Sequence, residues 1–236
     1  MASALGYRFL DANNKLLEPI GKNLENIRDI DDTAIDPVIK DIEFDVACDV
    51  NNPLTGPEGA AWIYGPQKGA SKEQLQKLDI GLRVLAKVVY KKFGEKINNV
   101  PGSGAAGGLG GGALIFLHAK LQRGIDLVLN YLNFEQLLSS CEFVITGEGK
   151  LDKQSLMGKA ISGIMKKASI CKVPVIVMAG IIDLTPEQLN QCAIHKAYCI
   201  NPSGIQPEVA IVNARDNLRQ TSCKMAFEIL KARQIS

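Results

Sequence analysis

The clearest pattern of hydrophobic and polar residues in this chain is that of an amphipathic helix. Apolar side chains recur at helical intervals from Leu75 to Val89. Ser71 and Gln74 have the spacing of a capping box at the start of this stretch, and Gly94 is placed to end it. The pattern therefore predicts a helix between these two ends, with its apolar face packed against the rest of the protein.

The residues before this helix predict short strands and a long loop. Tyr7 to Leu10 reads as a strand, and Gly21 to Ile30 as a brief helix. Apolar and acidic residues alternate from Ile42 to Val46, which is typical of a half-buried strand that delivers Cys48 and Asp49 to its end. The proline- and glycine-rich residues that follow exclude regular structure and favour fixed turns. They form either a binding loop or a long surface connection.

From Ile125 onward the chain alternates between strand and helix patterns. Strands separated by helices predict a parallel sheet whose faces the helices cover. We expect an α/β fold in two parts, residues 1–100 and 101–236. The expected strands are Phe143 to Ile145, Val173 to Met178 and Ala197 to Ile200, and the expected helices are 155–169, Thr185 to Gln191 and 210–232.

A glycine run from Gly102 to Gly112 leads into an apolar helical stretch, Ala113 to Leu121. Gly102, Gly104 and Gly107 satisfy the pattern GxGxxG, but the buried strand and the later acidic residue of a dinucleotide fingerprint are not found around it. Glycines at a helix start either present backbone N–H groups to a phosphate or carboxylate, or allow close helix packing. Both interpretations remain open at this point.

Composition and charge exclude several classes of protein. The 236 residues suffice for one large domain or two small ones, and the 46% hydrophobic share is that of a soluble globular protein. A net charge of +2, with lysines and carboxylates scattered along the chain, argues against a nucleic-acid surface. The six cysteines lack a CxxC pair, and neither a signal peptide nor a membrane span is recognisable. We therefore expect a cytoplasmic protein with reduced thiols.

The remaining candidates for chemistry are carboxylates and ammonium groups, because neither a serine-hydrolase elbow nor a P-loop is present. Phosphoryl transfer needs such groups to position the reactants and to neutralise spread negative charge. Asp49 could accept a proton from a substrate hydroxyl, and Lys68 or Lys159 could meet phosphate oxygens. Glu148 and Asp152 could hold Mg²⁺ through oxygen. For each residue the alternative is a surface charge or a side chain that stabilises a loop.

The stretch Glu142 to Lys159 combines several of these groups. Its apolar strand is expected to stop at a loop that begins with Thr146, in which Gly147 and Gly149 let the backbone approach a ligand closely. Ligands bind beyond the carboxyl ends of strands in open α/β sheets. This segment is therefore the first place where we expect chemistry.

Five segments together resemble the bacterial type of glycerate kinase. They span most of the chain and occur in the order, and at about the spacing, of that family. The segments are ALGYRFLD (residues 4–11), VACDVNNPLTGPEGA (46–60), GPQKGA (65–70), GSGAAGG (102–108) and TGEGKLDKQSLMGK (146–159).

The resemblance implies transfer of a phosphoryl group from ATP to a hydroxyl of D-glycerate, with Mg²⁺. It also implies an insert-type α/β domain over residues 1–100 with a mixed sheet, and part of a flavodoxin-like domain over 101–236. Residues on matching positions would line the cleft between the two domains. These residues are Asp49, Asn51, Thr55, Lys68, Glu148, Asp152 and Gln154. Phosphate or substrate binding would also involve Gly102, Gly104, Gly107, Gly147, Gly149 and Lys159.

The chain departs from the family in small and large ways. Lys150 replaces an arginine and Ser155 a threonine, which conserves the charge and the hydroxyl. Family members also extend further N-terminally and carry DSFKG, DGGEGT and GGSATNDGG segments, none of which occurs here, so the chain matches the C-terminal two-thirds. Two hypotheses follow. The chain is either a glycerate kinase or a non-catalytic remnant or subunit that needs a complementing N-terminal polypeptide, and a homo-oligomer is compatible with either.

Overall fold

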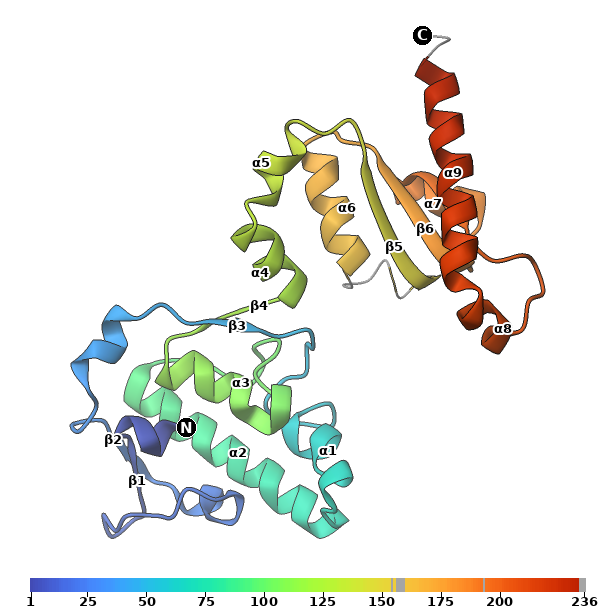
Figure 1. The fold of residues 1–236 in the computed structure, drawn as a ribbon. Coiled ribbons are helices and arrows are strands. Elements are labelled where there is room, and N and C mark those ends of the chain that lie inside the picture. The colour runs from blue at the N-terminus through green and yellow to red at the C-terminus, as the bar shows by residue number, and fades with distance from the viewer. Residues whose placement is uncertain (154, 156–159, 193, 234–236) are drawn as a thin grey trace. The chain divides into compact units, whose positions relative to one another are not determined.

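The protein consists of two compact units, Met1–Gly124 and Ile125–Ser236, each of which is described by itself. Figure 1 shows the elements of both units. The computed structural model describes residues 1–153, 155, 160–192 and 194–233. Both units combine helices with small sheets, which confirms the α/β fold class.

The units divide later than the expected boundary after residue 100. Helix α3 (Ala105–Phe116) packs against α1 (Ala60–Tyr64), and strand β4 (Lys120–Gln122) pairs in parallel with β3 (Asp45–Ala47). Both contacts join the segment after residue 100 to residues far earlier in the sequence. The first unit therefore continues to Gly124.

The long helix α2 (Lys72–Phe93) organises the first unit. Its capping box between Ser71 and Gln74 is formed, and Gly94 ends it with a left-handed φ of 78°. Both features confirm the sequence prediction, because capping depends on residues close together in the chain. The apolar face of α2 packs on η2 (Gly21–Asn26) and enters a core in which Val89 is fully buried.

The other elements of the first unit complete this core. Strand β1 (Arg8–Leu10) pairs antiparallel with β2 (Asp29–Asp31), and the register sets Phe9 opposite Ile30, so that both side chains enter the core. The brief helix predicted from Gly21 is a 3₁₀-helix that ends before β2. The remaining 3₁₀-helices are η1 (Ala2–Leu5), η3 (Pro37–Asp41) and η4 (Pro66–Lys68).

The second unit is a three-layer sandwich around a parallel sheet. Strands β5 (Val144–Leu151), β6 (Val175–Ile182) and β7 (Ile194–Cys199) are all parallel, in the order β5-β6-β7. Helix α6 (Ala160–Ile170) covers one face and α9 (Ala214–Arg233) the other (Figure 1). The remaining helices are α4 (Gly124–Tyr131), α5 (Phe134–Leu138), α7 (Pro186–Gln191) and α8 (Pro207–Val212).

The predicted stop of the strand at Thr146 is wrong, because β5 continues to Leu151. Gly147 lies opposite Met178 in β6, and a Cβ atom on Gly147 would lie 3.0 Å from the Met178 carbonyl oxygen. A Cβ atom on Gly180 would lie 2.6 Å from the Gly149 carbonyl oxygen. Glycines at these positions allow the two strands to approach each other closely. In the sequence, such glycines cannot be told apart from glycines of a loop.

Two helix predictions also need correction. The helix expected from Ala113 to Leu121 is α3, whose first turn is interrupted by left-handed φ values from Ala106 to Gly108 and which continues as a regular helix to Phe116. It ends there because His118 takes a left-handed φ of 51° and the chain then enters β4. The single helix expected over residues 210–232 is α8 and α9, which are interrupted at Asn213. Helix α7 confirms its prediction, with Thr185 as the N-cap.

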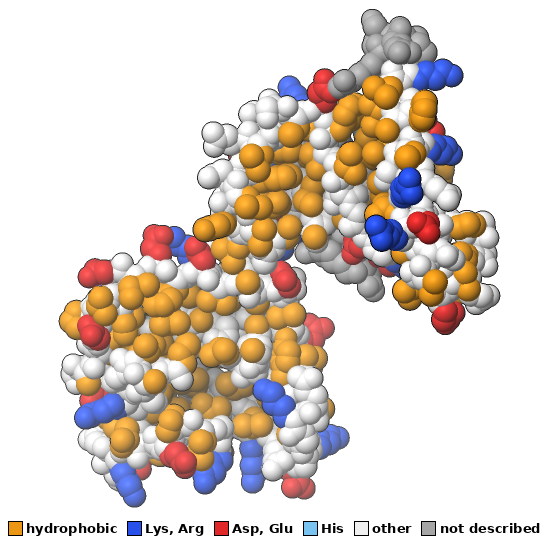
Figure 2. All heavy atoms as spheres, viewed as in Figure 1, with side chains coloured by type: hydrophobic (Ala, Val, Ile, Leu, Met, Phe, Trp, Pro, Cys, Tyr) orange, Lys and Arg blue, Asp and Glu red, His pale blue; other side chains and the backbone are white. Residues whose placement is uncertain are grey.

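Several large apolar side chains of the second unit are exposed to solvent and do not belong to its hydrophobic cores. Tyr131 is 89% exposed and Val212 82%, and Phe227 and Ile211 are also largely in contact with solvent. Figure 2 shows hydrophobic side chains gathered on the visible surface of this unit. Across the described residues, no helix has the length and apolar character that a membrane crossing requires.

Two glycines of α3 give a matched test of the packing in the first unit. A Cβ atom on Gly110 would lie 2.1 Å from the Gly102 carbonyl oxygen, whereas a Cβ atom on Gly112 would meet only the flexible ends of Met1 and Phe116. We expect Gly110→Ala to lower the free energy of unfolding by about 1–3 kcal/mol through overpacking. Gly112→Ala should raise it by about 0.5–1 kcal/mol, because alanine loses less backbone entropy in a helix.

Urea unfolding followed by the fluorescence of Trp62 measures both variants, because this single tryptophan lies in α1 of the first unit. Equal stability of Gly110→Ala and Gly112→Ala would contradict the packing described here.

Candidate functional site

Two loops of the first unit are held together by backbone contacts. The loop that follows β3 meets the glycine loop before α3, where the Gly104 N–H donates to the Asn52 carbonyl oxygen at 2.9 Å. A Cβ atom on Gly104 would lie 2.1 Å from the Pro53 carbonyl oxygen, and one on Gly102 would lie 2.8 Å from the Cys48 sulfur. Any side chain at these two glycines would force the loops apart.

The glycine loop therefore serves close packing, which is one of the two interpretations that the sequence left open. The N–H groups of Gly104, Gly107 and Gly108 already donate to carbonyl oxygens of the two loops. Gly102 and Gly107 take left-handed φ values of 83° and 81°, which glycine adopts at little cost. A role of these glycines in phosphate binding stays a prediction.

Asp49 lies just beyond the end of β3 and is exposed to solvent. One of its carboxylate oxygens, Oδ1, accepts a hydrogen bond from the Gly124 N–H at 2.9 Å. The preceding residue, Cys48, is also fixed, since its N–H donates to the Gln122 carbonyl oxygen at 2.7 Å. The carboxylate is thus oriented by the backbone and still open to a substrate, as a proton acceptor needs to be.

The loop that carries Asn51 and Thr55 is fixed by a buried carboxylate. Asp79 of α2 accepts from the Gly56 N–H at 2.7 Å and pairs with Arg83 at 2.9 Å. Thr55 is buried, whereas Asn51 is exposed. The sequence interpretation missed Asp79, although a charged residue on the otherwise apolar face of the predicted helix was a signal that it could have used.

Lys68 ends the short helix η4 and extends over the glycine loop. Its Nζ atom lies 3.2 Å from the position that a Cβ atom on Gly107 would take, so the missing side chain leaves room for the ammonium group. Gly69 follows in the left-handed conformation and turns the chain toward α2. Lys68 and the glycine loop, which are far apart in sequence, are therefore neighbours in the first unit.

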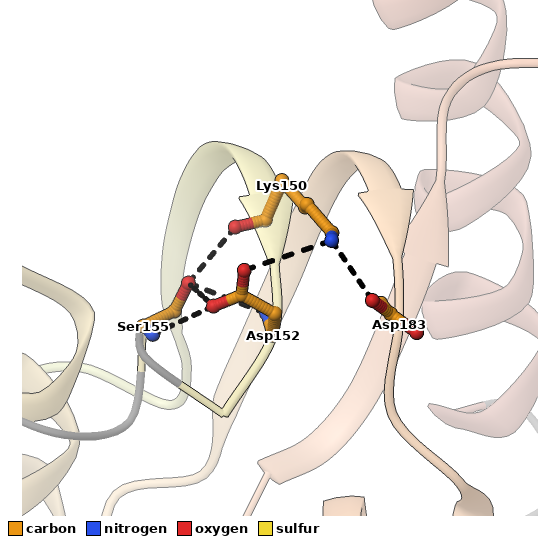
Figure 3. Close-up of polar contacts among 4 residues, drawn as sticks. All are labelled: Lys150, Asp152, Ser155 and Asp183. Carbon is orange, nitrogen blue, oxygen red and sulfur yellow. Dashed lines mark hydrogen bonds and ion pairs between the residues drawn. The ribbon is translucent and has the colours of Figure 1, made fainter.

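In the second unit, a hydrogen-bonded turn follows β5 (Figure 3). The Asp152 Oδ1 atom accepts from the Ser155 N–H at 3.0 Å, and the Ser155 hydroxyl oxygen lies 3.1 Å from the same atom. The buried Ser155 hydroxyl also lies 2.8 Å from the Lys150 carbonyl oxygen. Ser155 therefore holds the Asp152 carboxylate in one orientation at the carboxyl end of the strand.

Lys150 lies between two carboxylates in this turn. Its Nζ atom is 2.8 Å from Asp183 and 3.8 Å from Asp152, as Figure 3 shows. The hydrogen bond to Asp183 and the charge of that group raise the pKa of Lys150 above its usual value. The shorter contact makes Asp183 the principal partner, so the second oxygen of Asp152 is held only weakly by Lys150.

The remaining predicted residues of the second unit lie in or near β5. Glu148 is half-buried opposite Ala179, and Gly147 and Gly149 are part of the same strand. Gln154 and Lys159 lie outside the described residues.

A pair of asparagines, Asn201 just after β7 and Asn217 in α9, was not predicted. The Asn201 amide donates to the Gly180 carbonyl oxygen at 2.9 Å and accepts from the Asn217 amide at 2.9 Å. This contact links the end of β6 to α9.

The second unit contains oxygen ligands of the kind that Mg²⁺ prefers. Mg²⁺ in kinase sites is held by one or two carboxylates, with substrate phosphates and water completing the shell. Glu148 and Asp152 supply carboxylate oxygens of that kind, and the Asp152 carboxylate is already oriented by Ser155. Over the described part of the chain, histidines, cysteines and carboxylates nowhere form a cluster of three that could hold a metal by itself. Substrate oxygens would have to complete the site.

Comparisons with known proteins identify the family to which the chain is similar. The model of the "Glycerate kinase family" matches residues 1–230. A glycerate kinase of Halalkalibacterium halodurans is 40% identical over 96% of this chain and 60% of its own length. The glycerate 2-kinase of Escherichia coli is 39% identical over 96% of this chain and 59% of its own length. The chain thus spans about 60% of the length of these curated relatives.

A solved structure extends the similarity to the fold. A crystal structure from Salmonella typhimurium LT2 that carries the name glycerate kinase 2 superposes with a TM-score of 0.80 and 35% sequence identity. The similarity covers 99% of this chain and 61% of the other. The family model, the relatives and this structure all confirm the resemblance that the five sequence segments indicated. The chain belongs to the glycerate kinase family.

Proposed function

We propose that this chain acts in the ATP-dependent phosphorylation of a hydroxyl of D-glycerate. The observation that carries the proposal is the family match over residues 1–230, which includes every predicted site residue. The name of the family specifies the substrate and the reaction class, and the site supplies groups that suit both. An open carboxylate, a lysine over a glycine loop and an oriented aspartate are the groups that phosphoryl transfer requires.

The first unit supplies the acceptor chemistry in this proposal. The glycerate hydroxyl oxygen forms a bond to the γ-phosphorus of ATP, the bond from that phosphorus to the β–γ bridging oxygen breaks, and ADP leaves. Asp49 takes the proton of the hydroxyl, because its carboxylate is fixed by Gly124 yet exposed. Lys68 binds phosphate oxygens, and Asn51 and Thr55 contact the substrate from the loop that Asp79 anchors.

The second unit supplies the groups for the cation. Glu148 and Asp152 would hold Mg²⁺, which when bound neutralises charge on the phosphates. Ser155 is a positioning residue, since its N–H donates to the Asp152 carboxylate and its hydroxyl lies 3.1 Å from the same oxygen. Gly147 of β5 allows the strand to lie close to β6. Gln154 and Lys159, which lie outside the described residues, stay candidates for phosphate binding on the basis of the family motif alone.

ATP consumption by the purified chain with D-glycerate and Mg²⁺ tests the proposal directly. We expect turnover that depends on both glycerate and the cation, and that EDTA abolishes. The alternative, a non-catalytic remnant or subunit, predicts none. Similarity over 96% of this chain favours the kinase. A parallel assay adds, as a separate polypeptide, the segment of a glycerate kinase relative that has no counterpart in this chain. Turnover only in that mixture would assign the chain the role of a subunit.

Substitution of Asp49 tests the proposed proton acceptor. We expect Asp49→Asn to lower kcat by about 10²–10⁴-fold, the usual contribution of a general base. The protein should stay folded, because the amide oxygen can still accept from the Gly124 N–H. Asp41→Asn, at an exposed carboxylate outside both loops, is the matched control and should be fully active. An active Asp49→Asn variant would remove Asp49 from the mechanism.

Ser155 offers a test of positioning that separates orientation from folding. We expect Ser155→Ala to lower kcat and to raise the Mg²⁺ concentration needed for half-maximal activity by about 10–100-fold, the usual cost of losing a partner of a metal ligand. Ser155→Thr keeps the hydroxyl and should restore both values. A merely structural role would leave the Mg²⁺ dependence unchanged, and that result would contradict the assignment.

A further inference from the structure

A cavity of about 560 Å³ in the first unit is lined by three lysines. Lys22 comes from η2, Lys68 from η4 and Lys77 from the first turns of α2, so three separate elements contribute. The volume lies within the range of small-molecule pockets. Figure 2 shows basic side chains along the edge of this unit where η2 and the start of α2 lie. Only Lys68 belongs to a motif that the family resemblance singles out.

The charges around this cavity are not balanced by the protein. Glu25 is the one carboxylate among its lining residues, against three ammonium groups. Among the described residues, the ion pairs of the molecule involve other lysines and arginines, and none includes Lys22, Lys68 or Lys77. Lys22, Lys68 and Lys77 are all exposed, so water and salt screen their mutual repulsion and their ammonium groups are accessible to an anion that enters the cavity.

The backbone of the cavity is also suited to a ligand. Gly65 and Gly69 line it together with Gly21, and nothing lies within 4 Å of the position that a Cβ atom on Gly69 would take. Helix α2 begins at the cavity, since Gln74 and Lys77 of its first two turns are lining residues. The N-terminus of a long helix carries a partial positive charge that adds to that of the lysines.

We propose that this cavity binds the phosphate groups of a small phosphorylated ligand through Lys22, Lys68 and Lys77. The inference rests on the proposed function and deepens it, because Lys68 lies at the same time over Gly107 of the glycine loop. Two ligands of the reaction carry phosphate, the nucleotide and the phosphorylated product. Three ammonium groups suit a triphosphate better than a single phosphate, so the polyphosphate of the nucleotide is the expected occupant.

Calorimetric titration of the complete chain tests this site without any turnover. The probes are inorganic triphosphate, ATP and 3-phosphoglycerate. We expect triphosphate to bind with an affinity that falls as salt rises, since exposed charges are screened. Lys77→Gln and Lys22→Gln should each raise the Kd for triphosphate by about tenfold, whereas Lys87→Gln should leave it unchanged. Lys87 is the matched control because it is an exposed lysine of the same helix outside the cavity.

The three probes identify the source of the phosphate. If ATP binds at least as tightly as triphosphate, with the same loss in Lys77→Gln, the occupant is the nucleotide. If 3-phosphoglycerate alone shows that loss, the site is supported and belongs to the product. If Lys22→Gln and Lys77→Gln bind all three probes as the parent does, or Lys87→Gln weakens binding equally, the proposal is overturned.

The same measurements separate this proposal from the kinase itself. A parent chain that binds triphosphate in a Lys77-dependent manner but does not phosphorylate glycerate would keep the site and reject the proposed reaction. A parent chain that turns over, with no dependence of binding on Lys22 or Lys77, would keep the reaction and reject the site. Unfolding curves from Trp62 fluorescence confirm that each variant is folded before it is titrated.

Discussion

The first unit depends on one steric constraint, the direct contact of two backbones where glycine leaves no side chain between them. Gly104 lies against the Pro53 carbonyl group, and Gly110 against that of Gly102. Neither contact could form with a side chain present, because a Cβ atom on either glycine would lie 2.1 Å from the carbonyl oxygen that it faces. Since the loop after β3 and the loop before α3 are held against each other, Asp49 at the start of the first loop is placed by backbone geometry. A site for phosphoryl transfer gains most from such rigidity, because the reaction needs positioning more than covalent chemistry.

In the second unit, glycines also allow close backbone contact, here between two strands of a sheet. Gly147 and Gly180 allow β5 and β6 to lie close together, because a Cβ atom on either would meet a carbonyl oxygen of the other strand. The two strands end in register, with Leu151 of β5 opposite Ile182 of β6. Beyond that point the turn is held by Ser155, whose hydroxyl both donates and accepts within the segment. Asp152 is thus oriented by a neighbour only a few residues away. The unit therefore builds its carboxylate site from local hydrogen bonds on a strand end that long-range packing positions.

How much the sequence could predict follows from the range of each interaction. Helix α2 was predictable at both ends, because the cap of Ser71 and the left-handed Gly94 are decided within one turn. The identity of the site residues came from the family motifs, which record chemistry without geometry. The extent of β5 was not predictable, because glycines that allow two strands to approach look the same as glycines in a loop. The boundary after Gly124 was not predictable either, because it depends on the pairing of β3 with β4, which are far apart in sequence. The role of Asp79 was missed for the same reason, since its carboxylate binds the backbone of a loop that is distant in sequence.

The unpaired lysines of the first unit connect stability with function. Lys22, Lys68 and Lys77 line one cavity in which Glu25 is the one lining carboxylate, so their exposed ammonium groups are available to an anion. A ligand that binds only the folded state returns stability in proportion to its concentration over its Kd. An anion in this cavity would therefore stabilise the packing of η2 against α2, which is part of the core of the unit. Because Lys68 also lies over the glycine loop, the same binding event would bear on the placement of the loop that follows β3 and of Asp49 at its start.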